Sequence, residues 1–256
     1  MRAARRFDTD RTYPRLARSN VADRVQLFTE AVARPPPVYG ERWVELGARA
    51  FRAFEPGRSK LAAAILHRWT GPVPTVEETW LYLGAASGTT ASHVADLVGP
   101  AGRVYALERS PRSFARLLSL AERWPNLLPI LADARAPRAF AHLVPPVRGI
   151  YADIAQPDQV AIARENAALF LDRPGAAFVM ALKTPSMGRD AEASGHLADA
   201  ERALRGGFDL APSVELEPFH RGHYLVGGRA RAELFGERPR LTLARPRAPR
   251  PGRRAR

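Results

Sequence analysis

Short apolar runs alternate with helix-like stretches from Thr79 onward, and this alternation constrains the fold more than any other feature of the sequence. Strand-like runs cover Thr79 to Leu83, Arg103 to Leu107, Leu127 to Ala132, Gly149 to Asp153 and Ala176 to Lys183. Helix-like stretches between them include Thr90 to Leu97, Pro111 to Arg123 and Pro157 to Phe170. Strands separated by helices form right-handed βαβ units, so the pattern predicts an α/β fold with a mostly parallel sheet and helices on both faces. A further helix near Ala191 to Arg205 and two strand-like runs, Ser213 to Glu217 and Tyr224 to Val226, give an expected total of seven strands.

The segments outside this region divide the chain further. Between Val38 and Phe54, apolar and polar residues alternate around two glycines, which is typical of short antiparallel strands. A helix is predicted over Ser59 to Trp69, with Ser59 as its N-cap. The tail is rich in arginine and proline and too polar to pack. We expect four parts: a basic N-terminal arm over residues 1–20, a small β accessory unit over 21–57, the main α/β domain over 58–235 and a disordered tail over 236–256.

Composition excludes several classes of protein. The 256 residues include no cysteine, so disulfides, thiolate metal sites and cysteine nucleophiles are excluded. No stretch approaches the roughly 20 apolar residues of a membrane-spanning helix, and the arginine-rich start lacks the apolar segment of a secretory signal. The sequence therefore predicts a cytoplasmic globular enzyme.

The formal net charge of +13 lies mostly at the two ends of the chain. Residues 236–256 carry +7 and residues 1–18 carry +4, which leaves only +2 for residues 19–235. The ends are either phosphate-binding arms or solvated tails, and the charge pattern alone does not separate these readings.

A glycine-rich turn, Gly84 to Thr90, follows the first strand of the alternating region and leads directly into a helix. Such a turn can present free N–H groups to a ligand at the helix N-terminus. Its spacing is G-x-x-x-G, which differs from the G-x-G-x-x-G of dinucleotide enzymes and so disfavours a dehydrogenase. Acidic residues end the next three strands at Glu108, Asp133 and Asp153. Because the carboxyl ends of parallel strands line one crevice, the three carboxylates predict a ligand site there.

Several segments together resemble the fibrillarin family of RNA 2′-O-methyltransferases, especially its archaeal members. They are RSKLAAAI at Arg58 to Ile65, LYLGAASGTT at Leu81 to Thr90 with SHVAD after it, VGPAGRVYALE at Val98 to Glu108, DAR at Asp133 to Arg135, ADIAQPDQ at Ala152 to Gln159, LK at Leu182 to Lys183 and LEPFHRGH at Leu216 to His223. The resemblance implies a Rossmann-like class I methyltransferase fold that uses S-adenosylmethionine. An acidic residue normally precedes the histidine of the last segment, whereas this chain has Gly222.

The resemblance also implies the site residues and partners. Catalytic residues would be Lys60, Asp153, Lys183 and His223. Cofactor-binding residues would be Gly84, Ala85, Ser87, Gly88, Thr89, Thr90, Glu108, Arg109, Asp133, Ala134, Asp153, Ile154, Ala155 and Gln156. The implied partners are a box C/D guide RNA with target rRNA or tRNA, a Nop5-type scaffold protein and an L7Ae-type kink-turn protein. Neither a metal nor a membrane is expected.

Lys60 and Lys183 are the only lysines among 39 basic residues, and both fall within the motifs above. Arginine stays protonated at physiological pH, whereas lysine can be tuned to act as a base. We expect Lys183 to contact the ribose hydroxyl as base or electrostatic organiser, and Lys60 to hold the substrate. Asp153 would bridge the lysines and the cofactor, and His223 would position the nucleotide. A cation in the first turn of a helix is unfavourable, which indicates that Lys60 serves a purpose other than stability.

Other functions remain compatible with the same pattern. A methyltransferase of this fold could act on a protein side chain, or the fold could serve as a noncatalytic scaffold in a ribonucleoprotein. The Asp153-Ile-Ala-Gln-Pro sequence disfavours methylation of base nitrogens, which usually needs stacking aromatics or an Asn/Asp-Pro-Pro-aromatic signature at that place.

Overall fold

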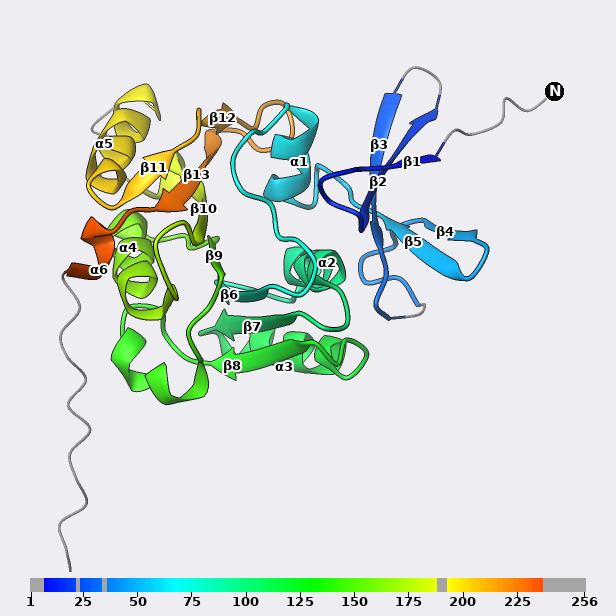
Figure 1. Cartoon of the computed structure of the whole chain (residues 1–256), viewed down its shortest axis with the longest axis horizontal. Helices are drawn as coiled ribbons and strands as arrows, with labels where there is room; N and C mark the ends of the chain where they lie inside the picture. The colour runs from blue at the N-terminus through cyan, green and yellow to red at the C-terminus, as the bar shows by residue number, and fades with distance from the viewer. Residues whose placement is uncertain (1–6, 22–23, 34–35, 188–192, 237–256) are drawn as a thin grey trace, which may run out of the picture.

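A mostly parallel sheet and a smaller antiparallel sheet make up the two β parts of the computed structural model (Figure 1). The structure describes residues 7–21, 24–33, 36–187 and 193–236. The predicted disordered tail therefore lies, except for Gly236, outside the described residues. Among the residues that are described, no helix is both long and apolar enough to cross a membrane.

The larger sheet runs in the order β11-β13-β10-β9-β6-β7-β8, and β12 pairs with β13 as an eighth strand. Its strands are β6 (Thr79–Leu83), β7 (Arg103–Glu108), β8 (Leu127–Leu131), β9 (Gly149–Ala152), β10 (Ala177–Lys183), β11 (Phe208–Leu210), β12 (Val214–Glu215) and β13 (His223–Ala230). Strands β6 to β10 are parallel, and β13 is antiparallel to β10. The expected α/β architecture is confirmed, with one strand more than predicted because β11 has only three residues and no recognisable pattern.

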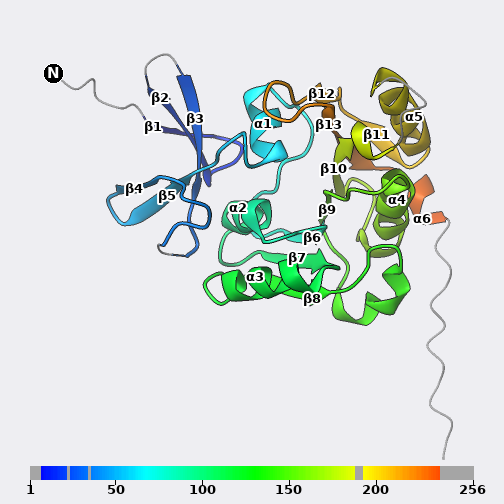
Figure 2. The same ribbon diagram turned by 180° about the vertical axis from the view of Figure 1, so that it is seen from behind.

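Helices cover both faces of this sheet (Figures 1 and 2). They are α1 (Lys60–Leu66), α2 (Thr89–Val98), α3 (Pro111–Ala121), α4 (Gln159–Phe170), α5 (Ala193–Arg205) and the short α6 (Glu233–Gly236), with 3-10 turns at Pro137–Ala139, Ala141–Leu143 and Thr184–Ser186. Residues of α1, α2 and α3 share one core cluster, and residues of α4 and α5 share another. Ser59 is the N-cap of α1 as predicted, but the helix ends at Leu66 rather than at Trp69.

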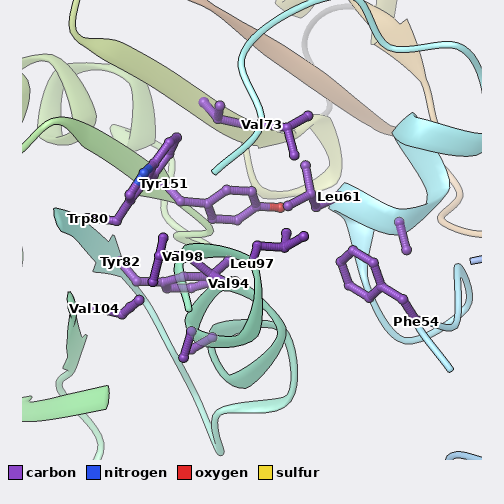
Figure 3. Packing of buried hydrophobic residues seen from close by; sticks show 14 of the residues in the cluster. Phe54, Leu61, Val73, Trp80, Tyr82, Val94, Leu97, Val98, Val104 and Tyr151 are labelled. Atoms are coloured by element: carbon purple, nitrogen blue, oxygen red, sulfur yellow. The ribbon is translucent and has the colours of Figure 1, made fainter. Parts of the chain in front are cut away.

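Alternate side chains of the central strand point into the two cores. Trp80 and Tyr82 of β6 belong to the cluster with α1 and α2, whereas Leu81 and Leu83 belong to the cluster with α4. This period of two is the geometry of a strand buried on both faces. Figure 3 shows Tyr82 close to Tyr151 of β9, and the two rings stack with centroids 4.7 Å apart.

The smaller sheet has the order β1-β2-β3-β5-β4 and is antiparallel throughout. Its strands are β1 (Phe7–Thr9), β2 (Leu16–Val21), β3 (Arg24–Glu30), β4 (Trp43–Leu46) and β5 (Arg49–Ala53). The N-terminal β unit therefore begins at residue 7 rather than at residue 21. The prediction of a basic arm over residues 1–20 was wrong for residues 7–20, which belong to this sheet and its loops. Arg15 of this segment is part-buried and donates to Asp96 O of α2 at 2.5 Å, whereas Arg18 is exposed and pairs with Asp10 at 2.8 Å.

Candidate functional site

The glycine turn after β6 brings the ends of three strands together. Gly84 has φ +80°, and a Cβ there would lie 2.7 Å from Asp153 O at the end of β9. Gly88 has φ +91°, and a Cβ would lie 2.4 Å from a Leu120 side-chain atom of α3. Both positions therefore require glycine because the turn packs closely against other parts of the protein, whether or not a ligand is bound. The approach at Gly84 fixes the position of Asp153, whose N–H also donates to Leu83 O at 2.9 Å.

A cavity of about 260 Å³ opens at the carboxyl ends of β6, β7, β8 and β9. Strand order reverses on either side of β6, and such a switch point is where open α/β sheets bind ligands. Nine of the predicted cofactor residues line this cavity: Gly84, Glu108, Arg109, Asp133, Ala134, Asp153, Ile154, Ala155 and Gln156. Lys183 lines it too.

The other five predicted cofactor residues do not line this cavity. Ser87 and Thr89 instead line a shallow hollow beside α3. Thr90 is buried, and its side chain lies within hydrogen-bonding reach of the Tyr82 hydroxyl. Ala85 and Gly88 form the inner side of the turn, where the Gly88 N–H donates to Ala85 O at 2.9 Å.

The acids in the cavity wall differ in how their oxygens are used. Each oxygen of Glu108 accepts one backbone N–H: from Ala86 at 2.8 Å and from Ser110 at 2.7 Å. Asp133 accepts from the Arg135 guanidinium at 2.6 Å, and this contact holds the pKa of the Asp133 carboxyl below its ordinary value. Arg109 is more distant from Asp133, at 3.8 Å. A carboxylate oxygen has more than one lone pair, so Glu108 can still accept hydroxyl donors.

Both lysines of the chain meet the carboxylate of Asp153. Lys183 Nζ lies 2.7 Å from Asp153 Oδ1 and donates to Asp153 O at 3.0 Å. Lys60 Nζ lies 3.1 Å from each carboxylate oxygen. The three side chains are mostly buried: Asp153 is 14% exposed, Lys183 15% and Lys60 16%. The cluster therefore holds two cations and one anion in a mostly buried place.

Electrostatics keep Asp153 ionised. Burial raises the pKa of the Asp153 carboxyl, but the Lys60 and Lys183 ammonium groups outweigh burial and hold this pKa below its ordinary value. Lys60 is the first residue of α1, where the helix macrodipole repels a cation. The contact with Asp153 therefore explains why a lysine occupies a helix position that is unfavourable for a cation.

His223 begins β13, directly opposite Lys183 in the ladder between β13 and β10. Its Nδ1 lies 2.8 Å from Arg221 O, and since a carbonyl only accepts, Nδ1 carries the proton. Burial lowers the pKa of His223, as do the two lysine charges, although the contact with Arg221 O raises it. A backbone carbonyl thus orients this ring, and Gly222 before it takes φ +67° in the turn.

The nearby His220 contacts a backbone carbonyl. Its Nε2 lies 2.7 Å from Pro56 O, and its ring centroid is 6.0 Å from that of His223. Within residues 7–236 where the structure is described, no three histidine, aspartate or glutamate side chains are grouped to hold a metal ion.

Two residues of this region escaped the sequence analysis. The Tyr82 hydroxyl lies within hydrogen-bonding reach of Asp153, and burial together with the Asp153 charge raises the pKa of Tyr82 well above its ordinary value. Gln159 is fully buried and binds the backbone of Lys183. Both lie inside segments that carried the resemblance, but a contact with a distant strand leaves no periodic signal in the sequence.

Comparison with known proteins gives one consistent result. The Fibrillarin family model matches residues 15–232. A "Fibrillarin-like rRNA/tRNA 2′-O-methyltransferase" of Aeropyrum pernix is 42% identical over 204 residues, which cover 79% of this chain and 87% of the relative. The crystal structure of Aeropyrum pernix fibrillarin with natively bound S-adenosyl-L-methionine superposes with a TM-score of 0.79 at 36% identity, covering 87% of this chain and 97% of that one. Fibrillarin from a fibrillarin/Nop5p complex superposes with a TM-score of 0.74 at 35% identity, covering 83% and 97%. This chain belongs to the fibrillarin family.

Proposed function

We propose that this protein methylates the ribose 2′-hydroxyl of RNA with S-adenosylmethionine as methyl donor. The observation that carries the proposal is the meeting of Lys60 and Lys183 at Asp153, on the wall of a cavity at the strand ends. The name of the Aeropyrum pernix relative states the same reaction on rRNA and tRNA. A noncatalytic scaffold has no need for a mostly buried cluster with an excess cation, because such a cluster is costly to bury.

The donors in the cavity wall suit S-adenosylmethionine. Glu108 has free lone pairs for the two hydroxyls of a ribose, and Asp133 can accept from an adenine amino group. The wall segment Asp153 to Gln156 would close the cavity near the reacting end. Arg135 pairs with Asp133 in the present structure and would share that carboxylate with the adenine or move aside.

The chain's own residues would align the acceptor and manage its charge. When bound, the cofactor supplies an electrophilic methyl group on a sulfonium, which becomes a neutral thioether when the 2′-oxygen takes the methyl group. The hydroxyl proton passes to Lys183 where Lys183 acts as a neutral base, and to solvent where it acts as a charged organiser. We assign the contact with that hydroxyl to Lys183, as base or as electrostatic organiser. The excess positive charge of the cluster stabilises negative charge that develops on the oxygen. His223 would hold the nucleotide, and Lys60 would keep Asp153 and the substrate in place.

Partner molecules would determine which RNA nucleotide is methylated. Residues 19–235 carry a net charge of only +2, and RNA affinity grows with the number of phosphates that are neutralised. We therefore place this protein in a box C/D ribonucleoprotein with a guide RNA, a Nop5-type scaffold and an L7Ae-type kink-turn protein. A fibrillarin with 35% identity to this chain has been crystallised with Nop5p. The cytoplasmic location stays a prediction from the sequence.

The test replaces Lys183 with arginine in the reconstituted complex and measures methyl transfer to a guided RNA. Arginine keeps the charge but not the compact ammonium geometry, and it cannot lose a proton. We expect the rate to fall by about 10² to 10⁴, as for loss of a positioned acid–base group. The matched control, Arg103→Lys at the exposed start of β7, exchanges the same residue types at the opposite end of that strand from Glu108 and should keep the wild-type rate. Wild-type activity of Lys183→Arg would refute the role of Lys183.

A further inference from the structure

A buried amide lies behind the lysine cluster and has no role in the reaction as described so far. Gln159 is the first residue of α4 and is 0% exposed. Its Nε2 donates to Lys183 O at 3.0 Å, and the Lys183 N–H donates to its Oε1 at 3.0 Å. A single side chain thus binds both polar backbone groups of the residue whose ammonium contacts Asp153.

The topology of the sheet explains why such a partner is needed. Strand β10 pairs with β9 only as far as Met180, which lies opposite Ala152. Beyond Ala152 the chain leaves the sheet and places Asp153 in the site, while β10 continues for three more residues. On its other side, Lys183 lies opposite His223 of β13. Buried backbone donors and acceptors need partners, and the amide of Gln159 supplies both where β9 is missing.

The same amide is not used to cap its own helix. The N-cap of α4 is Asp158, whose side chain makes no capping hydrogen bond. A residue in the first helical turn commonly serves the helix terminus, but here the side chain of Gln159 turns to the strand instead. Burying an amide is costly unless its hydrogen bonds are made, so the two bonds to Lys183 account for a glutamine in this place.

We propose that Gln159 is a positioning residue for Lys183. It keeps β10 extended up to its last residue and thereby fixes the point from which the long lysine side chain reaches Asp153. Lys183 Nζ then forms an ion pair with Asp153 Oδ1 at 2.7 Å and donates to Asp153 O at 3.0 Å. This inference rests on the proposed function of Lys183. A displacement of about 1 Å in a catalytic site can cost on the order of 10²-fold in rate, so a displaced strand end would slow the chemical step.

The experiment compares Gln159→Met with the wild type in the full reconstituted complex. Methionine has a similar length but makes neither hydrogen bond. We expect kcat to fall by about 10- to 100-fold while the KM for S-adenosylmethionine stays within about threefold. If this variant does not fold, Gln159→Asn is used instead, because its amide is one carbon too short to reach both backbone groups. The same fall in kcat with little change in KM is expected. The control is Asn126→Asp, which alters another buried amide that binds Ala95 O and Gly99 O, away from the cavity. It should lower the melting temperature and leave kcat unchanged.

A double-mutant cycle shows whether Gln159 acts through Lys183. We expect Gln159→Met to cause no further loss of single-turnover rate once Lys183 is methionine, because the group it positions is gone. Independent, multiplying losses would overturn the proposal, as would a wild-type kcat for Gln159→Met. If Lys183→Met alone keeps the wild-type rate, the proposed role of Lys183 fails instead. If Lys183→Met is slow and Gln159→Met is not, only the positioning role fails.

Discussion

Two cations around one anion are the defining feature of this protein at the scale of single residues. Lys60, Lys183 and Asp153 come from α1, β10 and the end of β9, and each is mostly buried. The sequence pointed to the lysines because every other basic residue outside histidine is an arginine. It could not reveal Tyr82 or Gln159, because their contacts with the cluster depend on where distant strands end.

Removal of the anion should destabilise the fold. Asp153→Asn would leave two mostly buried ammonium groups facing each other, and we expect the free energy of unfolding to fall by about 3 kcal/mol. Addition of Lys60→Met removes one cation, so the double variant should be more stable than Asp153→Asn alone. Urea denaturation measures both values. Asp133→Asn is the control, because its partner Arg135 is exposed and its loss should matter much less. A double variant no more stable than the single one would contradict this charge balance.

The pH dependence of this contribution has a definite sign. The folded-state pKa of Asp153 lies below its ordinary value of 3.8. The ionised carboxylate therefore stabilises the fold above that pH, and the contribution is lost as the pH falls through the lower folded-state value. Asp153 should stay ionised throughout the neutral range, in which the enzyme would work.

A buried polar junction joins α2 to the N-terminal sheet at the scale of elements. Arg52 of β5 is fully buried and contacts Asp96 at 2.6 Å, Glu41 at 2.8 Å and Ser92 Oγ at 2.6 Å. Asp96 also accepts from Thr29 Oγ1, from Trp124 Nε1 and from the Val32 N–H, at 2.9 to 3.0 Å. Since α2 begins at the glycine turn after β6, this junction connects the N-terminal sheet to the element beside the candidate site.

His93 of α2 should make this junction sensitive to acid. Burial lowers the pKa of His93 well below 6.5, and the Arg52 charge lowers it further. Its other polar neighbours are Asp96, Tyr39 and the hydroxyl of Thr29, and the Phe54 ring stacks on it. The unfolded chain therefore binds a proton at pH values where the folded chain does not, so the free energy of unfolding falls as the pH drops below 6.5.

The measurement is the slope of unfolding free energy against pH between about 6.5 and 4.5, in which an unperturbed histidine titrates. His93→Gln should flatten this slope, although the lowered pKa values of His220 and His223 leave part of it in place. His142→Gln, at an exposed histidine, should leave the slope unchanged. An unchanged slope in His93→Gln would mean that the junction does not depend on a neutral histidine.

Element boundaries could be predicted where burial on both sides of the sheet makes a continuous apolar run. Thr79 to Leu83 was predicted to the residue, and the other central strands differ by one residue at an end. The start of the N-terminal sheet was missed, because six arginines among the first 18 residues hide its pattern. The arginines that pack inward, Arg15 and Arg52, are held by hydrogen bonds that they donate to other elements. Sequence alone does not show such partners.

At the scale of the whole molecule, the uneven distribution of charge along the chain is the main feature. The enzyme body carries little net charge, and most of the excess lies in residues 1–18 and 236–256. Under the proposed function, we expect partner molecules to select the nucleotide that the site methylates. The sequence predicted that the three acidic strand ends line one crevice, and the structure places all three on one cavity, together with six candidates that the family resemblance implied.

The most direct test of the central claim is the identity of the methylated atom. The complex is incubated with S-adenosylmethionine and target RNA, with and without guide RNA, and the digested nucleosides are analysed by mass spectrometry. We predict one methyl group on the ribose 2′-oxygen of the guided nucleotide and none without the guide. Methyl groups on a base or on a protein partner, or site-specific ribose methylation by the isolated chain, would contradict the account.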